Sequence, residues 1–476
     1  MKSLVLAEKP SVARDIARVL GCHKNISGAI EGSNYIVTWA LGHLVTLADP
    51  EEHDKKFKAW DMSYLPMVPK KWELVVIKQT SKQYHNVKTQ LFRKDVSEII
   101  IATDAGREGE LVARWILDKS GCHKPIRRLW ISSVTDKAIK EGFAHLKDGR
   151  AYNDLYHAAR SRAEADWLVG INATRALTCK YNAQLSCGRV QTPTLAMIAH
   201  REQQIRSFKP EDYYGLRCTT SVTGGSVGTM ASIVTWTWQQ KKSGSLRSFN
   251  KDLITGLDKK LKNQTLTVTD VHTSSKRTPS PGLYDLTELQ RDANKRFGFS
   301  AKETLNIMQS LYEHHKVLTY PRTDSRYIGT DIVPTIKERL KACNIGPYKK
   351  YIPELLKKPL KTSKAFVDDK KVSDHHAIIP TEEYVQMEHM SNNERKIYDL
   401  VVRRFISVLY PAFEYEQTTL KAEAAGETFT AKGKVIKAAG WKAVYADAAS
   451  SGSSASQYDA YGDYEDSEEF WRRFPK

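Results

Sequence analysis

The sequence predicts a multidomain protein in which an α/β domain is followed by helical and β-rich parts. Its 476 residues exceed what one hydrophobic core usually holds, and about 150 residues per domain gives roughly three domains. Residues 1–150 contain two strand–loop–helix units with apolar strands, which predict a parallel sheet covered by helices. From about residue 212, β-branched and aromatic residues dominate and predict β-structure.

The α/β part begins with an apolar strand at residues 3–7. Ser11 is expected to cap the helix that follows, and Gly21 to close it. Residues 98–103 (Glu-Ile-Ile-Ile-Ala-Thr) have the composition of a fully buried strand. A turn containing glycine leads from this strand to a helix at 111–119.

Helical and strand-like stretches alternate over the rest of the chain. Ser300 and Glu303 form a capping box that opens one helix. The predicted helical stretches are 151–205, 286–297 and 396–410, and the predicted strands are 213–222, 229–238, 265–271 and the region 413–445.

Charge and composition limit the function classes. The chain carries a formal net charge of +18, and because residues 451–476 hold six acidic and three basic residues, residues 1–450 carry +21. Such a basic body favours a polyanionic partner, most often nucleic acid, over a protein whose charge only keeps it soluble. No apolar run approaches the roughly 20 residues that span a bilayer, and no signal peptide opens the chain. We therefore expect a cytoplasmic protein without a membrane partner.

The six cysteines do not have the spacing of a structural site. None forms a Cys-x-x-Cys pair, so neither a zinc site nor a disulfide framework is expected. We expect reduced thiols that are mostly buried.

Acidic residues follow both apolar strands. Glu8 comes after the first, and Asp104, Glu108 and Glu110 come after the second. Sites form at the carboxyl ends of strands in open α/β sheets, and clustered carboxylates suit a hard cation such as Mg²⁺. The alternative is a solvated acidic loop, and the pattern alone favours neither.

A tyrosine precedes a proline in the segment 318–325. The turn at Pro321 is able to present the Tyr320 hydroxyl as a nucleophile, and Arg322 is suited to grip a phosphate. By spacing alone, a core tyrosine beside a turn is the simpler interpretation. In the segment 373–381, His375 and His376 follow Ser373 and Asp374, and one of these histidines facing a phosphate is more plausible than a two-histidine metal site.

Five motifs in this order and spacing resemble one family. They are Glu-Lys-Pro-Ser at 8–11, Ala-Thr-Asp-Ala-Gly-Arg-Glu-Gly-Glu at 102–110, Gly-Arg-Val-Gln-Thr-Pro-Thr at 188–194, Thr-Tyr-Pro-Arg-Thr-Asp-Ser at 319–325 and His-His-Ala-Ile-Ile-Pro-Thr at 375–381. From residue 1 to about 445 the chain resembles type IA DNA topoisomerases, specifically the bacterial topoisomerase III group.

The resemblance implies an architecture that encloses a hole. It comprises a Toprim domain (1–150), the N-terminal part of a helical base with a single-strand groove (151–211), a β-rich arch in two parts (212–278 and 405–446), and a helical domain with the active tyrosine (279–404). Residues 447–476 are expected to be a disordered acidic tail rich in serine and glycine.

The resemblance also implies a role for each matching residue. Tyr320 is the nucleophile that becomes linked to a 5′ phosphate, Arg322 steadies that phosphate, and His375 lies near it. Lys9 stabilises charge in the transition state, and Glu8 takes part in proton transfer. The acids that match the Mg²⁺-binding set are Glu8, Asp104 and Glu108, and the residues that match positions in the single-strand groove are Arg162, Asp166, Arg189, Gln191 and Thr192.

Two features depart from the family pattern. Gly106 stands at the middle position of the usual Asp-x-Asp-x-Glu triplet, which predicts weaker Mg²⁺ binding and disfavours a second metal. Relatives also continue beyond the point where this sequence stops, so we expect an incomplete helical base that binds and cleaves single strands but relaxes plasmid poorly.

The resemblance implies ATP-independent relaxation of negative supercoils or decatenation, with Mg²⁺ and without zinc. The implied partner is DNA, in single-stranded segments of negatively supercoiled or catenated duplex, and the chain is expected to be a monomer associated with the nucleoid. One alternative is a single-stranded-DNA-binding, cleavage-competent remnant that cannot complete strand passage. A Toprim nuclease or primase is disfavoured, because neither needs the Tyr-Pro-Arg context.

Overall fold

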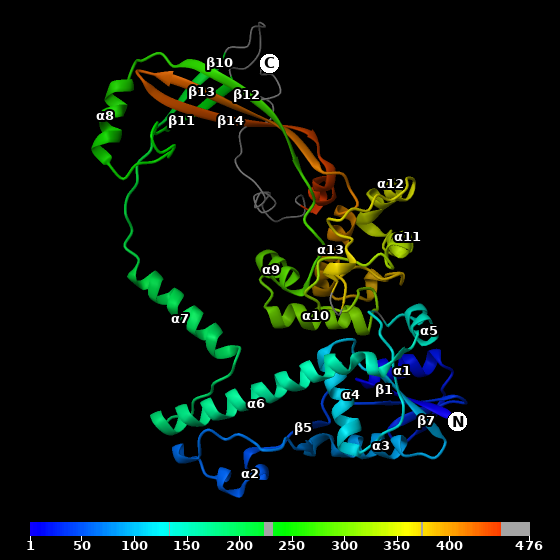
Figure 1. Cartoon of the computed structure of the whole chain (residues 1–476). Coiled ribbons are helices and arrows are strands. Elements are labelled where there is room, and N and C mark those ends of the chain that lie inside the picture. The colour runs from blue at the N-terminus through cyan, green and yellow to red at the C-terminus, as the bar shows by residue number, and fades with distance from the viewer. Residues whose placement is uncertain (133, 223–231, 373–374, 449–476) are drawn as a thin grey trace. The chain divides into compact units, whose positions relative to one another are not determined.

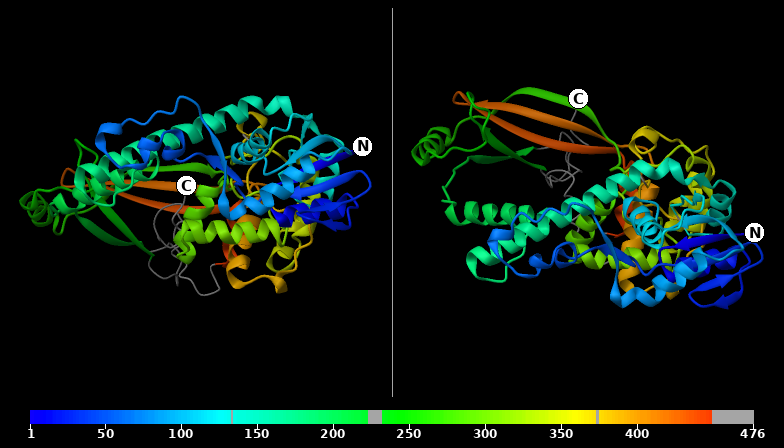
Figure 2. Two further views of the ribbon diagram at one scale, coloured as in Figure 1. Left: turned by 90° about the horizontal axis from the view of Figure 1, so that it is seen from below. Right: turned by 60° about the horizontal axis from the view of Figure 1, so that its bottom comes forward.

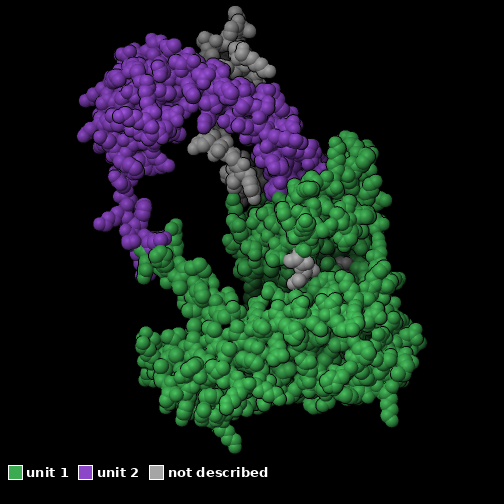
Figure 3. All heavy atoms as spheres, in the orientation of Figure 1, with its two compact units in different colours: residues 1–203, 282–405 green, residues 204–281, 406–476 purple. Residues whose placement is uncertain are grey.

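The computed structural model describes residues 1–132, 134–222, 232–372 and 375–448. These residues fall into two compact units, one comprising residues 1–203 and 282–405 and the other residues 204–281 and 406–476 (Figure 3). The expected acidic tail from 449 onward lies outside the described residues, as do Ser373 and Asp374.

The first unit is built on a seven-stranded sheet in the order β2-β3-β4-β1-β7-β8-β9. The central strands β4, β1, β7 and β8 run parallel to one another, whereas β2, β3 and β9 add antiparallel edges. The strands are β1 Lys2–Ala7, β2 Lys24–Ile26, β3 Ala29–Glu31, β4 Tyr35–Trp39, β7 Val96–Ala102, β8 Ile126–Arg128 and β9 Lys147–Asp148, and a separate pair is β5 Val45–Leu47 with β6 Leu74–Val76.

Helices cover both faces of this sheet because alternate residues of its central strands point to opposite sides. Leu4 and Ile99 point to the face covered by α3 Ser81–Leu91, α4 Arg107–Ser120 and the first turns of α6 Asn153–Tyr181. Val5 and Ile100 point to the face covered by α1 Pro10–Val19 and α5 Asp136–Ala144. The 29-residue helix α6 extends well past the sheet (Figure 1; Figure 2).

The remaining helices of this unit are mostly amphipathic. They are α2 Pro50–His53, α7 Gln191–Ser207, α9 Leu286–Phe297, α10 Ala301–Glu313, α11 Ile336–Ala342, α12 Ile352–Leu356 and α13 Asn392–Ser407, of which α7 and α13 run into the second unit. The Ser300 hydroxyl accepts the Glu303 backbone N–H at 3.1 Å, so the predicted cap of α10 is confirmed. The predicted Ser11 cap is wrong: Lys9 occupies the N-cap of α1, because Pro10, which has no N–H to satisfy, takes the first helical position.

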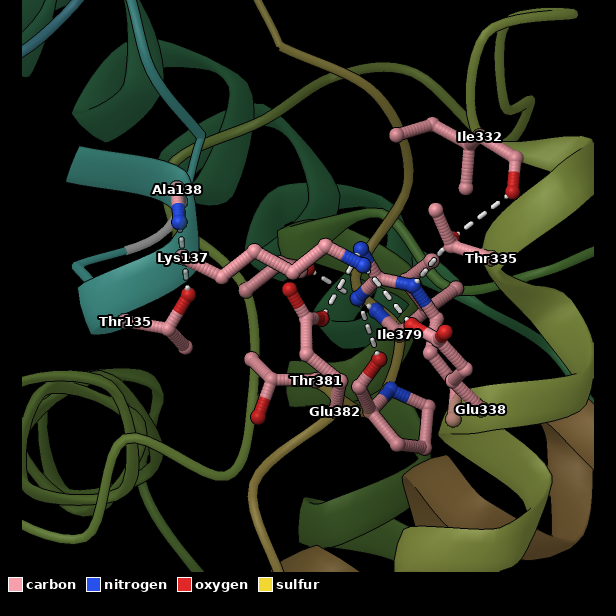
Figure 4. A network of polar contacts seen from close by, with 12 residues as sticks. Thr135, Lys137, Ala138, Ile332, Thr335, Glu338, Ile379, Thr381 and Glu382 are labelled. Carbon is pink, nitrogen blue, oxygen red and sulfur yellow. Dashed lines mark hydrogen bonds and ion pairs between the residues drawn. The ribbon is translucent and has the colours of Figure 1, made fainter. Parts of the chain in front are cut away.

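One ion pair joins α5 to α11. The Lys137 ammonium lies 2.8 Å from the Glu338 carboxylate (Figure 4), and this contact connects the α/β part with the helical segment 282–405 of the same unit. Within that segment, the buried Arg339 donates to the Thr335 hydroxyl at 2.8 Å and to the Pro380 carbonyl at 2.7 Å.

The second unit is a five-stranded antiparallel sheet in the order β10-β11-β14-β13-β12. Its strands are β10 Arg217–Val222, β11 Ser232–Gln239, β12 Thr267–Thr278, β13 Phe413–Ala424 and β14 Glu427–Ala438, with α8 Lys251–Leu261. Ile254 and Leu257 of α8 pack on Trp236, Trp238 and Phe429. The predicted strand-like region 413–445 is too long: the strands end at Ala438, and a 3₁₀ segment Gly440–Ala448 follows, opened by Gly440 at a φ of 49°.

All six cysteines are free thiols. Cys22 and Cys343 are buried and the other four are partly exposed, so the expectation that most are buried is wrong. No helix in the described parts of the chain combines the length and the apolar character that crossing a bilayer requires.

Candidate active site

Two carboxylates meet at the carboxyl end of the central sheet. β1 and β7 are parallel neighbours with Ala7 opposite Ala102, so the residues that follow them leave the sheet side by side. The Glu8 carboxylate accepts the backbone N–H of Asp104 at 3.1 Å. The neighbouring apolar strands therefore place both predicted acids at one edge.

Burial makes this pair of acids weak. It raises the pKa of Glu8 from its ordinary value of 4.5 to about 7, and the Asp104 charge adds to the shift. Burial also raises the pKa of Asp104, although the Lys9 ammonium opposes that change. The two side chains share a half-buried space in which one negative charge disfavours the next.

A buried ion pair supports the loop that carries Asp104. Arg128 of β8 is fully buried and donates to the Glu110 carboxylate at 3.0 Å. The same guanidinium donates to the carbonyls of Thr103 at 2.8 Å and Asp104 at 2.7 Å. A Cβ at Gly109 would lie 2.0 Å from the Asp104 carbonyl, so the glycine lets the first turn of α4 pack directly on this loop.

Tyr320 approaches the acids from the helical segment. Its backbone N–H donates to the Ser132 carbonyl at 3.1 Å, and its hydroxyl lies near enough to the Asp104 carboxylate for the two groups to change each other's pKa. Burial raises the pKa of Tyr320 above its ordinary value, and the charges of Asp104 and Glu8 raise it further. The phenol is therefore protonated at neutral pH and has to lose its proton when it acts as a nucleophile.

Aromatic rings fix the orientation of Tyr320. The His375 ring stacks on it with centroids 4.2 Å apart, and the Tyr312 ring meets it edge-on at 5.5 Å. Burial lowers the pKa of His375 to about 3, so the imidazole is neutral at physiological pH. Its Nδ1 atom lies 3.4 Å from the Ser132 hydroxyl, and its buried Nε2 atom makes no well-formed hydrogen bond with any described residue.

Two cations act on this site. The Lys9 ammonium lies 2.6 Å from the Glu313 carboxylate of α10, and its charge opposes the rise in the pKa of Glu8 and Asp104. Arg322 is exposed, and its charge acts on Tyr320 by lowering the pKa of the phenol, against the larger effect of burial. One cation thus acts on the two acids and the other on the phenol.

Glu108 is separate from Glu8 and Asp104. Its carboxylate lies 3.7 Å from His43 Nε2 and 3.9 Å from Arg162 Nη1, and the interaction with His43 is the main cause of its lowered pKa. Within the described residues, no three His, Cys, Asp or Glu side chains lie close enough together to hold one metal ion. Glu8 and Asp104 thus form a pair of acids, whereas Glu108 contacts His43 and Arg162 instead.

A chain of charges continues from Glu108 along α6. Arg162 lies 3.9 Å from both Glu108 and Asp166, and Arg189 donates to the Asp166 carboxylate at 2.5 Å. These side chains are between about a third and three fifths exposed. The predicted groove residues Arg162, Asp166 and Arg189 therefore form one exposed row.

Gln191 and Thr192 open the next helix, α7. The Thr192 hydroxyl accepts the Gly188 backbone N–H at 3.0 Å, and the Gln191 side chain lies against Gly188, where a Cβ would stand 3.2 Å from it. Their side chains therefore shape the turn before α7 in this structure.

Several residues of the site escape sequence reasoning. Arg128, Ser132, His43 and Glu313 each contact a predicted site residue. For Arg128 the sequence offers one signal, a charged residue in a short stretch that also contains Ile126 and Leu129. The others carry none, because their contacts join segments that are far apart in the sequence.

Comparison with known proteins places this site in a family. A family model described as DNA topoisomerase matches residues 150–465, and a Toprim domain model matches residues 3–134. The chain belongs to the DNA topoisomerase family. It is 63% identical to DNA topoisomerase 3 of Bacillus cereus (strain ATCC 14579) and 60% identical to DNA topoisomerase 3 of Bacillus subtilis (strain 168), in each case over 93% of the chain.

The chain spans about three fifths of the length of these DNA topoisomerase 3 relatives, with 59% and 60% covered. Among solved structures it is similar to full-length topoisomerase I from Thermotoga maritima, with a TM-score of 0.65 and 23% identity over 93% of this chain and 67% of that one. The predicted membership in the type IA topoisomerases and the predicted fold, a Toprim domain with β-rich and helical parts, are confirmed.

Proposed function

We propose that this chain acts as a type IA DNA topoisomerase that breaks one strand through a link between Tyr320 and a 5′ phosphate. The observation that carries the proposal is the position of Tyr320 at the end of the Toprim sheet, where its backbone N–H donates to the Ser132 carbonyl and the charges of Asp104 and Glu8 raise the pKa of its hydroxyl. Family membership supports the same reaction. No ATP is needed, because a tyrosine phosphodiester keeps roughly the energy of the phosphodiester that it replaces.

Residues of this site are able to supply every proton transfer that the cleavage step needs. The Tyr320 oxygen attacks phosphorus and forms a new O–P bond, while the bond from phosphorus to the 3′ oxygen breaks and its electron pair stays on that oxygen. Asp104 accepts the phenol proton, and Glu8, with a pKa of about 7, supplies a proton to the leaving oxygen. Religation is the reverse reaction.

Cations and a neutral imidazole complete the proposed site. Lys9 and Arg322 offset the negative charge that builds on the phosphate oxygens. His375 is neutral and stacks on Tyr320, so it acts as an orienting and hydrogen-bonding group rather than as a charge.

We propose that single-stranded DNA follows the exposed row on α6. Arg162 and Arg189 supply positive charge and Asp166 orients both guanidiniums. Gln191 and Thr192 shape the turn at the end of this path. The net charge of +21 on residues 1–450 favours this polyanionic partner.

Mg²⁺ fits the pair of acids in part. Glu8 and Asp104 offer hard oxygen ligands whose pKa values are raised by burial, and a divalent cation would favour their charged forms. Glu108 joins them only if its side chain leaves His43 and Arg162. A bound Mg²⁺ supplies positive charge that positions the phosphate for religation. Zinc and ATP are not part of the proposal, and we expect a cytoplasmic, nucleoid-associated monomer.

Two assays on one preparation test the proposed function. If a single-stranded oligonucleotide carries its label on the fragment 5′ to the cut, cleavage would release a free labelled fragment. If the label is on the fragment 3′ to the cut, it would migrate with the protein in denaturing gels. Relaxation of negatively supercoiled plasmid, run alongside, separates the topoisomerase from a remnant that cleaves without passing strands.

The matched control is Tyr320→Phe, which removes the nucleophile and keeps the ring that packs on His375 and Tyr312. We expect an adduct with the unsubstituted chain and none with Tyr320→Phe, while both bind the oligonucleotide. An adduct with the phenylalanine variant, or none with the unsubstituted chain, would overturn the assignment.

A further inference from the structure

Glu313 is an acid at the last residue of α10 that none of the five sequence motifs contains. Its carboxylate lies 2.6 Å from the Lys9 ammonium, a contact that joins residues 304 positions apart. Gln309, one turn earlier on α10, donates to the same carboxylate oxygen. The Glu313 side chain is 12% exposed and the Lys9 side chain 32%, so the pair is only partly screened by water.

The position of Lys9 explains why it needs this partner. Lys9 is the N-cap of α1, whose first turn contains no acidic residue, and the positive end of the helix dipole lies beside it. The Lys9 charge also acts on Glu8 and Asp104, where it partly offsets the rise in pKa that burial causes. The ammonium thus contacts Glu313 and lies near enough to the two acids at the end of the sheet for its charge to act on both.

A phosphate that uses Lys9 has to compete with Glu313. An ammonium already paired at 2.6 Å loses that contact when it turns to a phosphate oxygen, and the released carboxylate then takes up a cation from solution. The loss of the Lys9–Glu313 ion pair therefore lowers the affinity for the phosphate. It also lowers the net number of counterions released on binding.

We propose that Glu313 is a positioning residue that holds Lys9 in the phosphate-free site and gives it up when a DNA phosphate enters. The inference rests on the proposed role of Lys9 toward DNA. It assigns to α10 a part in setting the affinity of the site, separate from the chemistry of Tyr320.

A second ion pair joins α1 to the segment that follows α10 and provides a matched control. The Lys316 ammonium lies 2.6 Å from the Asp15 carboxylate, and these side chains are 19% and 21% exposed. Asp15→Asn therefore removes a pair of equal length and similar burial between the same segments without touching Lys9. Any effect of loosening these segments should appear in Asp15→Asn as well as in Glu313→Gln.

The test measures oligonucleotide affinity against salt, from 50 to 200 mM, in EDTA. All variants carry Tyr320→Phe so that no strand is cut, and they are Glu313→Gln, Glu313→Asp, Lys9→Gln, the double variant Lys9→Gln with Glu313→Gln, and Asp15→Asn. We expect Glu313→Gln to tighten binding about fivefold, the size of one weakly screened ion pair. The slope of log affinity against log salt should steepen by about 0.7, because one more cation is free for phosphate.

The double variant decides whether the effect passes through Lys9. We expect Glu313→Gln to change neither affinity nor slope when Lys9 is already glutamine, and Asp15→Asn to leave the slope unchanged. Glu313→Asp, which keeps the charge on a shorter side chain, should lie between the unsubstituted protein and Glu313→Gln.

Three results would overturn the inference: an unchanged or shallower slope in Glu313→Gln, an equal effect in the Lys9→Gln background, or the same effect in Asp15→Asn. Failure of the proposed function would look different, because it would appear as a missing adduct with the tyrosine intact, whereas these measurements involve no cleavage.

Discussion

Replacing Glu110 with glutamine tests whether the buried ion pair holds the loop that carries Asp104. One Glu110 oxygen accepts from Arg128 at 3.0 Å and the other from Arg114 at 2.9 Å. A glutamine has only one acceptor oxygen, so its amide N–H₂ would face one of these donors. The Arg128 guanidinium, with 0% exposure, would also keep its charge without a counter-ion.

The expected cost follows from the burial of this pair. Breaking a buried ion pair by removing one partner costs about 3–5 kcal/mol. Since 1.4 kcal/mol corresponds to a factor of ten, hydrogen exchange at the protected amides of β7 should speed up by about a hundredfold to a few thousandfold. Loss of the anchor at the Asp104 carbonyl should also lower the yield of the Tyr320 adduct.

Native-state hydrogen exchange is the suitable assay because it reports the stability of this sheet alone. The control is Asp148→Asn, which breaks the ion pair with Arg150 in the same domain. Those side chains are 52% and 87% exposed, so water and salt screen the pair and exchange should change far less than in Glu110→Gln. If Glu110→Gln speeds exchange no more than Asp148→Asn does, the buried pair does not support the loop.

Three further predictions concern the acids and the DNA. Glu8→Gln should raise the melting temperature of the metal-free chain at pH 8 but hardly at pH 5. The pKa of Glu8 rises from 4.5 to about 7 on folding, so the contribution of Glu8 to stability is lost as pH rises through 7. Glutamine stays neutral and therefore avoids this loss at pH 8. An equal shift at both pH values would contradict the raised pKa. Gly106→Asp should be tolerated, because the backbone is extended and a Cβ meets nothing within 4 Å; stability should rise by a few tenths of a kcal/mol from the better N-cap, and calorimetry should show tighter Mg²⁺ binding. Unchanged Mg²⁺ affinity would mean that position 106 does not face the ion. Finally, oligonucleotide affinity should fall steeply with salt and stay nearly constant on addition of EDTA, and collapse with EDTA would mean that the metal is needed for binding.

The sequence was sufficient for most of the local structure. Short continuous apolar runs predicted the central strands, and the Ser300–Glu303 box predicted the start of α10, because strand composition and capping act over a few residues. It failed at Ser11, where the preceding proline took the first helical position. It also failed after Ala438, where a glycine with positive φ ends the strand.

The sequence also determined the family, because five motifs in one order identify it without any knowledge of contacts. It placed Glu8 and Asp104 at the same edge of a sheet, since both follow buried parallel strands. Only the tertiary structure decided which side chains meet there. Tyr320 lies within the range of the Asp104 and Glu8 charges, Lys9 is held by Glu313, and Glu108 turns to His43 and Arg162. The physical reason is that a charged side chain turns to the nearest opposite charge that packing leaves within reach, and in a folded chain that charge often comes from a segment hundreds of residues away.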